Sequence, residues 1–141
     1  QKGQAHKAAI IELGIKKHGL RNNLSALLAF GGREQAAICG AILAAREASI
    51  PVLLDGFICT AAAAPLFGTS KNSLDHCLFG HLSAEPGHRL LLEAMGKSAI
   101  LDLNMRLGEG TGAALALSIL KGAIACHNNM ATFDSAGISS S

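Results

Sequence analysis

Residues 50–66 read Ile-Pro-Val-Leu-Leu-Asp-Gly-Phe-Ile-Cys-Thr-Ala-Ala-Ala-Ala-Pro-Leu, an apolar run followed by a turn and a segment rich in alanine. A short apolar run that ends in Asp-Gly is typical of a buried strand that turns at its carboxyl end. The residues after the turn predict a helix over 57–66, stopped at Pro65. This stretch therefore predicts one strand-turn-helix unit, with its strand at 50–54.

The same order recurs along the chain. Downstream, strands are predicted at 76–82 and 100–103, and the helices after them begin at Pro86 and span 113–126. Upstream, the pattern predicts helices over 4–17 and 33–48 and a strand over 24–30. Strands and helices that alternate at this spacing favour an α/β fold, an open parallel sheet flanked by helices in a Rossmann-like three-layer arrangement. The turns after the strands then meet at one edge of the sheet, where ligands bind.

The composition excludes several classes of protein. Half of the 141 residues are hydrophobic and 16% are charged, so the chain has enough apolar surface for a core and is not expected to be disordered. No uncharged stretch reaches the about 20 apolar residues of a membrane-spanning helix. A net charge of +2 and the lack of Trp and Tyr argue against a nucleic-acid surface with stacking rings. With no secretory or lipidation motif in view, the expected location is cytoplasmic.

Four cysteines lie far apart and form no Cys-x-x-Cys motif. They fall in apolar runs, which is typical of reduced thiols in a core. The alternative is a zinc site that gathers His76, Cys77 and His81, with Cys126 and His127. Structural zinc usually takes close ligand pairs from two loops, so we expect neither a metal nor another cofactor.

The most informative motif is Arg-Leu-Gly-Glu-Gly-Thr-Gly at residues 106–112. Three glycines around one carboxylate let the backbone adopt unusual dihedral angles and let a ligand approach closely. A carboxylate would repel a phosphate, so Glu109 is better interpreted as a base or as an acceptor for a ligand N–H. The alternative is a Glu that caps a helix on a surface turn.

Two other turns carry polar residues. Residues 83–88 read Ser-Ala-Glu-Pro-Gly-His, and a serine hydroxyl with backbone N–H groups at a helix start suits an anion, with positive charge from His88 or Arg89. The alternative is that Ser83 caps its helix. Asp55 follows a predicted strand, where an acid can bind sugar hydroxyls. Its alternative is an ordinary turn aspartate.

Taken together, three motifs closely resemble the nicotinate-nucleotide:dimethylbenzimidazole phosphoribosyltransferase family, which acts in the assembly of the cobalamin lower ligand. They are Leu-Leu-Asp-Gly-Phe-Ile-Cys-Thr-Ala-Ala at 53–62, Ser-Ala-Glu-Pro-Gly-His at 83–88 and Arg-Leu-Gly-Glu-Gly-Thr-Gly-Ala-Ala-Leu-Ala at 106–116. The resemblance runs over nearly the whole chain in the same order and includes Met-Ala-Thr-Phe at 130–133.

The resemblance implies transfer of the 5-phosphoribosyl group from nicotinate mononucleotide to 5,6-dimethylbenzimidazole or a related azole. The products are α-ribazole 5′-phosphate and nicotinate. By position in the family's Gly-Glu-Gly motif, Glu109 is the general base that takes the azole N–H proton. The implied substrate-binding residues are Met105 and Leu107 for the azole and Ser83, Gly87, Asp55 and Gly56 for the phosphoribosyl group, with Gly108 as a further substrate-binding residue.

The chain also departs from the family. Members are more than twice as long, so residues 1–136 correspond to the C-terminal part of the family's α/β domain, an incomplete part of a larger fold, and 137–141 are expected to be a flexible tail. The chain is either a fragment or a naturally shortened form. Its exposed surface predicts a homo-oligomer or association with the missing N-terminal part. The alternative function is a truncated module that binds nucleotide or azole, or assists assembly, without catalysis.

Overall fold

The structure, a computed structural model, describes residues 2–20 and 22–137. Its centre is a sheet of three parallel strands in the order β1-β2-β3. Its elements are α1 (Lys2–His18), α2 (Asn23–Phe30), α3 (Arg33–Glu47), β1 (Val52–Leu54), α4 (Phe57–Thr69), the 3-10 helix η1 (Lys71–Leu74), β2 (Cys77–Ser83), α5 (Pro86–Ala94), β3 (Ala99–Met105) and α6 (Thr111–Asn129). The three strands predicted at 50–54, 76–82 and 100–103 are thus confirmed.

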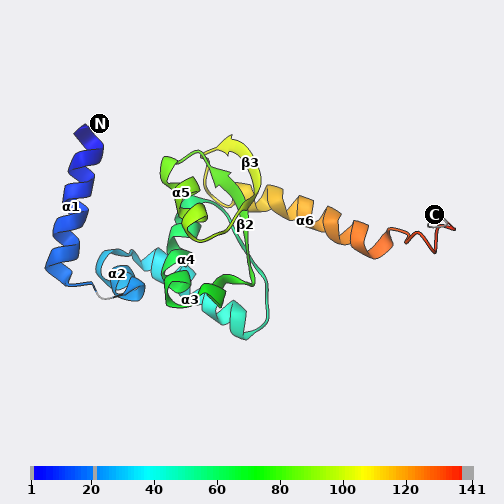
Figure 1. Cartoon of the computed structure of the whole chain (residues 1–141), viewed down its shortest axis with the longest axis horizontal. Helices are drawn as coiled ribbons and strands as arrows, with labels where there is room; N and C mark the ends of the chain where they lie inside the picture. Colours follow the sequence, from blue (N-terminus) through cyan, green and yellow to red (C-terminus); the bar gives the residue numbers. More distant parts are fainter. Residues whose placement is uncertain (1, 21, 138–141) are drawn as a thin grey trace.

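Helices cover both faces of the sheet (Figure 1). Successive side chains of a strand point to opposite faces. In β2, Phe79 packs in the hydrophobic core with side chains of α3, α4 and α5, whereas a Cβ at the next residue, Gly80, would lie 3.1 Å from the backbone of Ala113 in α6. Helices α3, α4 and α5 therefore lie on one face and α6 on the other. The predicted α/β architecture, an open parallel sheet flanked by helices, is confirmed.

The core lies between the sheet and the three helices α3, α4 and α5. It holds apolar side chains from all three helices and from β1 and β2. The buried members are Cys39, Ile42, Leu54, Ala63, Leu66, Leu74, Cys77, Phe79, Leu82, Leu92 and Met95. This core fixes the positions of the strands, and with them the edge of the sheet at which the strands end.

The segment 24–30 is a helix, so its prediction as a strand is wrong. Asn22 and Ser25 form a capping box: the Ser25 N–H donates to Asn22 Oδ1 at 2.8 Å, and the Asn22 N–H donates to Ser25 Oγ at 3.1 Å. The segment has no β-branched residue, and leucine and alanine have high helix propensity. The cap and the composition together outweigh the apolar run.

Helix α4 does not stop at Pro65, which lies inside it. Proline cannot donate to the carbonyl of Ala61, one turn earlier, which costs helix stability. The following residue, Leu66, is buried in the core, and the hydroxyl of Thr69 donates to the Pro65 carbonyl at 3.1 Å. Packing therefore carries the helix one turn beyond the proline. The last helix is likewise longer than the predicted 113–126.

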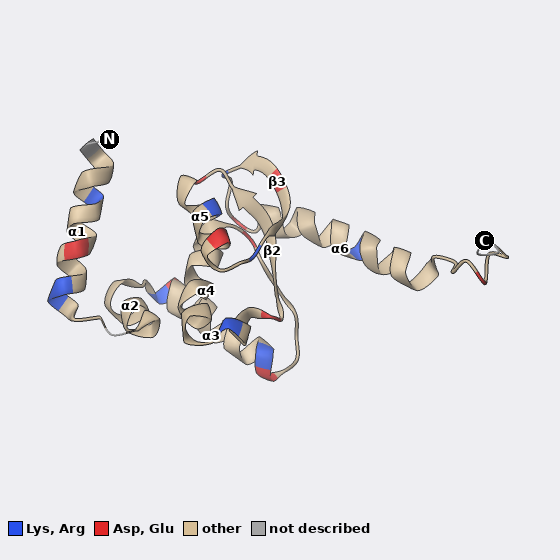
Figure 2. Cartoon of the chain, viewed as in Figure 1, with Lys and Arg blue, Asp and Glu red and all other residues tan. Residues whose placement is uncertain are grey.

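Two helices extend from the sheet domain (Figure 1). Helix α1 packs only lightly, with the ring of His18 5.7 Å from the ring of Phe30. Helix α6 covers the sheet with its first turns and then continues outward, with one charged side chain, Lys121, along its length (Figure 2). Several of its apolar side chains are exposed: Leu115, Leu117, Ile119 and Ile124.

The four cysteines are unpaired with one another, and two of them are buried in the core. Cys39 and Cys77 are buried, and burial raises the pKa of each thiol, while Cys59 is half-buried and Cys126 is exposed. Within residues 2–20 and 22–137, no three His, Cys, Asp or Glu side chains form a group able to hold a metal ion. No helix in those ranges is long and apolar enough to cross a membrane. Of the predicted flexible tail 137–141, residues 138–141 lie outside the described residues.

Candidate active site

A cavity of about 640 Å³ opens at the carboxyl ends of the three strands. Small-molecule sites in proteins commonly fall in this range of volumes. Its wall comes from the end of β2, the turns that follow the three strands and the first turn of α4. The lining residues are Asp55, Gly56, Phe57, Ile58, Cys59, His81, Ser83, Glu85, Arg106, Leu107, Gly108, Glu109 and Gly110. The turns predicted to meet at this edge of the sheet do so.

Most of the predicted site residues line this cavity. Those are Asp55, Gly56, Ser83, Leu107, Gly108 and Glu109. Met105 ends β3 opposite Ser83, and its carbonyl accepts the Ala84 N–H at 2.8 Å. Gly87 lies in the first turn of α5, where a Cβ would come within 3.2 Å of the Phe57 ring. Met105 and Gly87 do not line the cavity, but each contacts a segment that does.

Glu109 sits in a tight turn between β3 and α6. Its φ of 63° and the φ of 80° at Gly110 place two consecutive residues in the left-handed region, which is strained for a residue with a side chain. The Thr111 hydroxyl donates to the Gly108 carbonyl at 3.0 Å and closes the turn. Gly110 is the N-cap of α6, so the interpretation of Glu109 as a capping residue is wrong.

Asp55, in the turn after β1, caps the N-terminus of α6. Its Oδ1 accepts the Ala113 N–H at 2.9 Å, a favourable contact for an anion at the start of a helix. Its carbonyl accepts Nδ1–H of His81 at 2.7 Å and the His81 backbone N–H at 3.2 Å. Asp55 therefore ties the turn after β1 both to β2 and to the helix that carries the Glu109 turn.

His81 is buried between two glycines. A Cβ at Gly56 would lie 2.7 Å from its Cε1 atom, and a Cβ at Gly112 would overlap its ring. Both glycines are therefore required for the close approach of the backbone to the imidazole. The sequence suggested His81 only as a zinc ligand, because nothing in the spacing indicates that two glycines from different turns enclose it.

The positive charge that the sequence predicts near Ser83, from His88 or Arg89, does not come from His88. His88 is fully buried, and its pKa is lowered by burial and then by the nearby His81, so it does not supply a positive charge. Its Nδ1 accepts the Ser83 N–H at 2.9 Å. The Ser83 hydroxyl accepts the Glu85 N–H at 3.2 Å, and Glu85 rather than Ser83 is the N-cap of α5.

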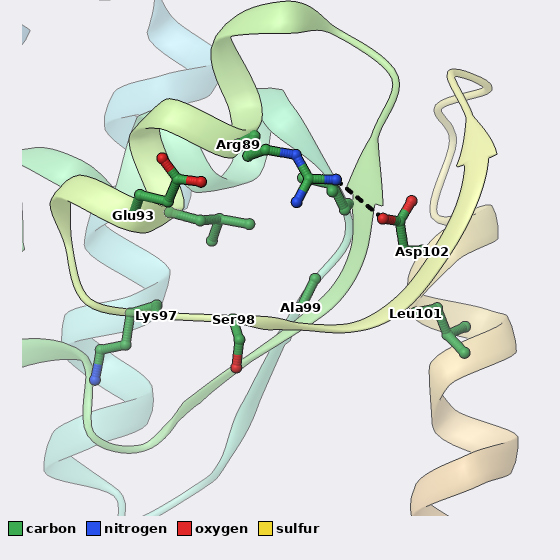
Figure 3. A pocket seen from close by; sticks show the side chains of 9 residues that line it. Arg89, Glu93, Lys97, Ser98, Ala99, Leu101 and Asp102 are labelled. Carbon is green, nitrogen blue, oxygen red and sulfur yellow. Dashed lines mark hydrogen bonds and ion pairs between the residues drawn. The ribbon is translucent and has the colours of Figure 1, made fainter.

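Arg89 faces a second, smaller cavity of about 270 Å³ between α5 and β3 (Figure 3). Its guanidinium is 3.0 Å from Asp102 Oδ2, and both side chains are well exposed. Surface pairs of this kind contribute little to stability. Arg89 does not line the larger cavity.

The positive charge at the cavity wall comes instead from Arg106, which forms an ion pair that the sequence did not indicate. Arg106 donates to Glu85 Oε1 at 2.7 Å and so links the turns after β2 and β3. Glu85 and Arg106 are 21 residues apart, and only the parallel pairing of β2 with β3 brings them together. The apolar lining at Phe57 and Ile58 was also missed, because both residues read as ordinary helix positions.

The chain matches known proteins over nearly its whole length. The phosphoribosyltransferase family matches residues 1–138. Similar relatives are the nicotinate-nucleotide–dimethylbenzimidazole phosphoribosyltransferases of Rhodobacter capsulatus, 56% identical over 136 residues, and Brucella anthropi, 58% identical over 137 residues. Each alignment covers 96% of this chain, but 41% of the first relative and 40% of the second.

A solved structure gives the same result. The crystal structure of CobT from Thermus thermophilus superimposes with a TM-score of 0.86 at 40% identity, over 100% of this chain and 42% of that one. The chain thus spans about 40% of the length of the relatives it matches. The resemblance carried by the three motifs is confirmed, and the chain belongs to the nicotinate-nucleotide–dimethylbenzimidazole phosphoribosyltransferase family.

Proposed function

We propose that this chain carries the base-bearing part of a site that transfers the 5-phosphoribosyl group from nicotinate mononucleotide to 5,6-dimethylbenzimidazole. The reaction yields α-ribazole 5′-phosphate and nicotinate for the lower ligand of cobalamin. The observation that carries the proposal is the placement of Glu109 on the wall of a cavity of about 640 Å³, beside Leu107, whose side chain is 65% exposed.

In the proposed reaction, the Glu109 carboxylate accepts the proton of the azole N–H. The other ring nitrogen then attacks the anomeric carbon from the face opposite nicotinate and forms the new C–N bond with inversion. The bond from that carbon to the pyridinium nitrogen breaks, and its electron pair neutralises the pyridinium, which leaves as nicotinate. A carboxylate within hydrogen-bonding reach suffices for this proton transfer.

The two ends of the cavity suit the two substrates. Leu107 offers apolar surface to a flat azole, with Gly108 leaving space beside it and Met105 at the end of β3. The phosphoribosyl group is assigned to the side of Ser83, Asp55 and Gly56, with Gly87 in the first turn of α5. The first turn of α4 opens there, and backbone N–H groups at a helix start favour a phosphate.

The test is nicotinate release from nicotinate mononucleotide and dimethylbenzimidazole, measured on the purified chain and on Glu109→Gln. We expect the variant to lose about 10²- to 10⁴-fold in rate, the usual contribution of a general base, and to bind the azole within a few-fold. Glu93→Gln on α5 is the matched control, because Glu93 lines the other cavity. Unchanged turnover in Glu109→Gln would remove Glu109 from this role.

The coverage of the relatives favours a second candidate. Since the chain spans about 40% of their length, it also fits a truncated module that binds the nucleotide or azole without turnover. Azole binding without nicotinate release would support this module. In either case we infer a homo-oligomer or association with the missing N-terminal part, and a cytoplasmic location.

A further inference from the structure

Two turns of the cavity wall are joined by a buried chain of hydrogen bonds. The Ser83 N–H donates to His88 Nδ1 at 2.9 Å, His88 Nε2 lies 3.0 Å from Thr60 Oγ1, and the Thr60 hydroxyl donates to the Gly56 carbonyl at 2.9 Å. Because Nδ1 accepts a hydrogen bond, the neutral imidazole carries its proton on Nε2 and donates it to Thr60. The chain of bonds thus runs in one direction from Ser83 to Gly56.

The members of this bridge that lie between the two turns do not reach the cavity. His88 is 0% exposed and Thr60 is 1% exposed. The ring centroids of Phe57 and His88 lie 5.7 Å apart, and the nearby His81 of β2 contributes, after burial, to the lowered pKa of His88. Both ring nitrogens of His88 are paired, so any effect on a ligand must act through Ser83 and Gly56.

The strand geometry explains why Ser83 needs a partner other than the sheet. The pairing of β2 with β3 is in register up to His81 and Leu101 and then shifts by two residues, so that Ser83 stands opposite Met105. An irregularity of this kind takes a backbone group out of the ladder and redirects it. Here the redirected group is the Ser83 N–H, and His88 is its acceptor.

We propose that His88 is a positioning residue that holds the Ser83 turn against the Gly56 turn and thereby sets the wall on which the phosphoribosyl group binds. The proposal rests on the proposed function, because it assigns that wall to the nucleotide. In addition to the proposed function, His88 is a buried residue that touches no substrate and still determines nucleotide affinity. The azole end of the cavity, at Leu107, lies outside the bridge.

Two amide variants separate the two halves of the bridge. In His88→Asn the carboxamide oxygen can take the place of Nδ1 and accept the Ser83 N–H, whereas in His88→Gln the carboxamide reaches the place of Nε2 and meets Thr60. We expect the Ser83 amide to exchange with solvent about tenfold faster in His88→Gln than in His88→Asn, since one buried hydrogen bond is lost.

Nucleotide affinity should follow the same order. The dissociation constant for nicotinate mononucleotide is expected to rise about tenfold in His88→Gln and less in His88→Asn, with the constant for dimethylbenzimidazole unchanged in both. Thr60→Val breaks the other end of the bridge without removing the imidazole and should also weaken only the nucleotide, whereas Thr60→Ser, which keeps the hydroxyl, should restore affinity. This pair keeps the test valid if a His88 variant fails to fold.

His76→Gln is the matched control, because His76 Nε2 lies 3.0 Å from the Ile42 carbonyl and His76 does not line the cavity. Equal loss of affinity for both substrates, or equal Ser83 exchange in the two His88 variants, would overturn the proposal. If the unmodified chain binds no nucleotide, the proposed function fails, and with it the link to nucleotide affinity. In that case the Ser83 amide exchange rates of His88→Asn and His88→Gln still show whether His88 holds the Ser83 turn.

Discussion

Gly112 shows how closely single residues are fitted at the sheet edge. A Cβ at this position would overlap the His81 ring, which is 1% exposed and is held by the Asp55 carbonyl, so the ring cannot move aside. We expect Gly112→Ala to lower the free energy of unfolding by about 3 kcal/mol, the upper end for an overpacked site. Urea unfolding followed by circular dichroism measures this loss.

Gly122→Ala is the matched control for that variant. Gly122 lies in the same helix, α6, and in residues 2–20 and 22–137 nothing beyond its chain neighbours and the local helix backbone would lie within 4 Å of the added methyl group. Alanine has the higher helix propensity, so this variant should gain up to about 1 kcal/mol. A Gly112→Ala protein as stable as the unmodified chain would show that His81 is not confined by the two glycines.

For single residues, the sequence predicted the position of the site better than the role of each residue in it. Glu109 was predicted to lie at a turn open to a ligand, and glycines on both sides were sufficient for that. The capping of α6 by Asp55 was not predictable, because the two groups are 58 residues apart and meet only through the parallel pairing of the strands. His88 was predicted, as an alternative to Arg89, to add positive charge at the Ser83 turn, but its imidazole is buried.

Among the elements, α2 depends most on a local signal. Its capping box joins Asn22 and Ser25 at the start of an eight-residue helix, and so short a helix is marginal without its cap and its packing. We expect Asn22→Ala to cost about 1 kcal/mol and to speed amide exchange over residues 23–30. Asn22→Asp keeps the acceptor and should behave like the unmodified chain. Equal exchange in Asn22→Ala and Asn22→Asp would show that packing on α4 alone holds α2.

The same element explains where sequence reasoning failed. A short apolar run fits a buried strand and a helix equally well, and the strand prediction for 24–30 ignored the cap before it. The β strands were predicted because each apolar run ended at a turn and was followed by a helix. Pro65 was overvalued as a stop, since core packing of Leu66 compensates for the lost hydrogen bond. From residue 50 onward, the local turn signals therefore predicted the order of the strands and α-helices correctly, while packing decided where each element ends.

For the molecule as a whole, the surface of α6 is the feature that the sheet domain leaves unexplained. The helix has one charged residue, and Ile119 and Ile124 are 55% and 59% exposed. Several large apolar side chains exposed along one helix mark a contact with another chain. We expect the 14.4 kDa chain to self-associate, and Ile119→Glu with Ile124→Glu to shift it toward the monomer in light scattering coupled to size exclusion.

The control for this prediction changes charge without removing apolar surface. Lys121→Glu lies between the two isoleucines in sequence and alters the net charge by the same two units as the double variant, so it should leave the mass distribution unchanged. A change in both proteins would assign the effect to charge repulsion instead. If the unmodified chain has a mass of 14.4 kDa at high concentration, α6 is not a contact between copies. Its apolar side chains would then be left for the part of the fold that this chain lacks relative to its family.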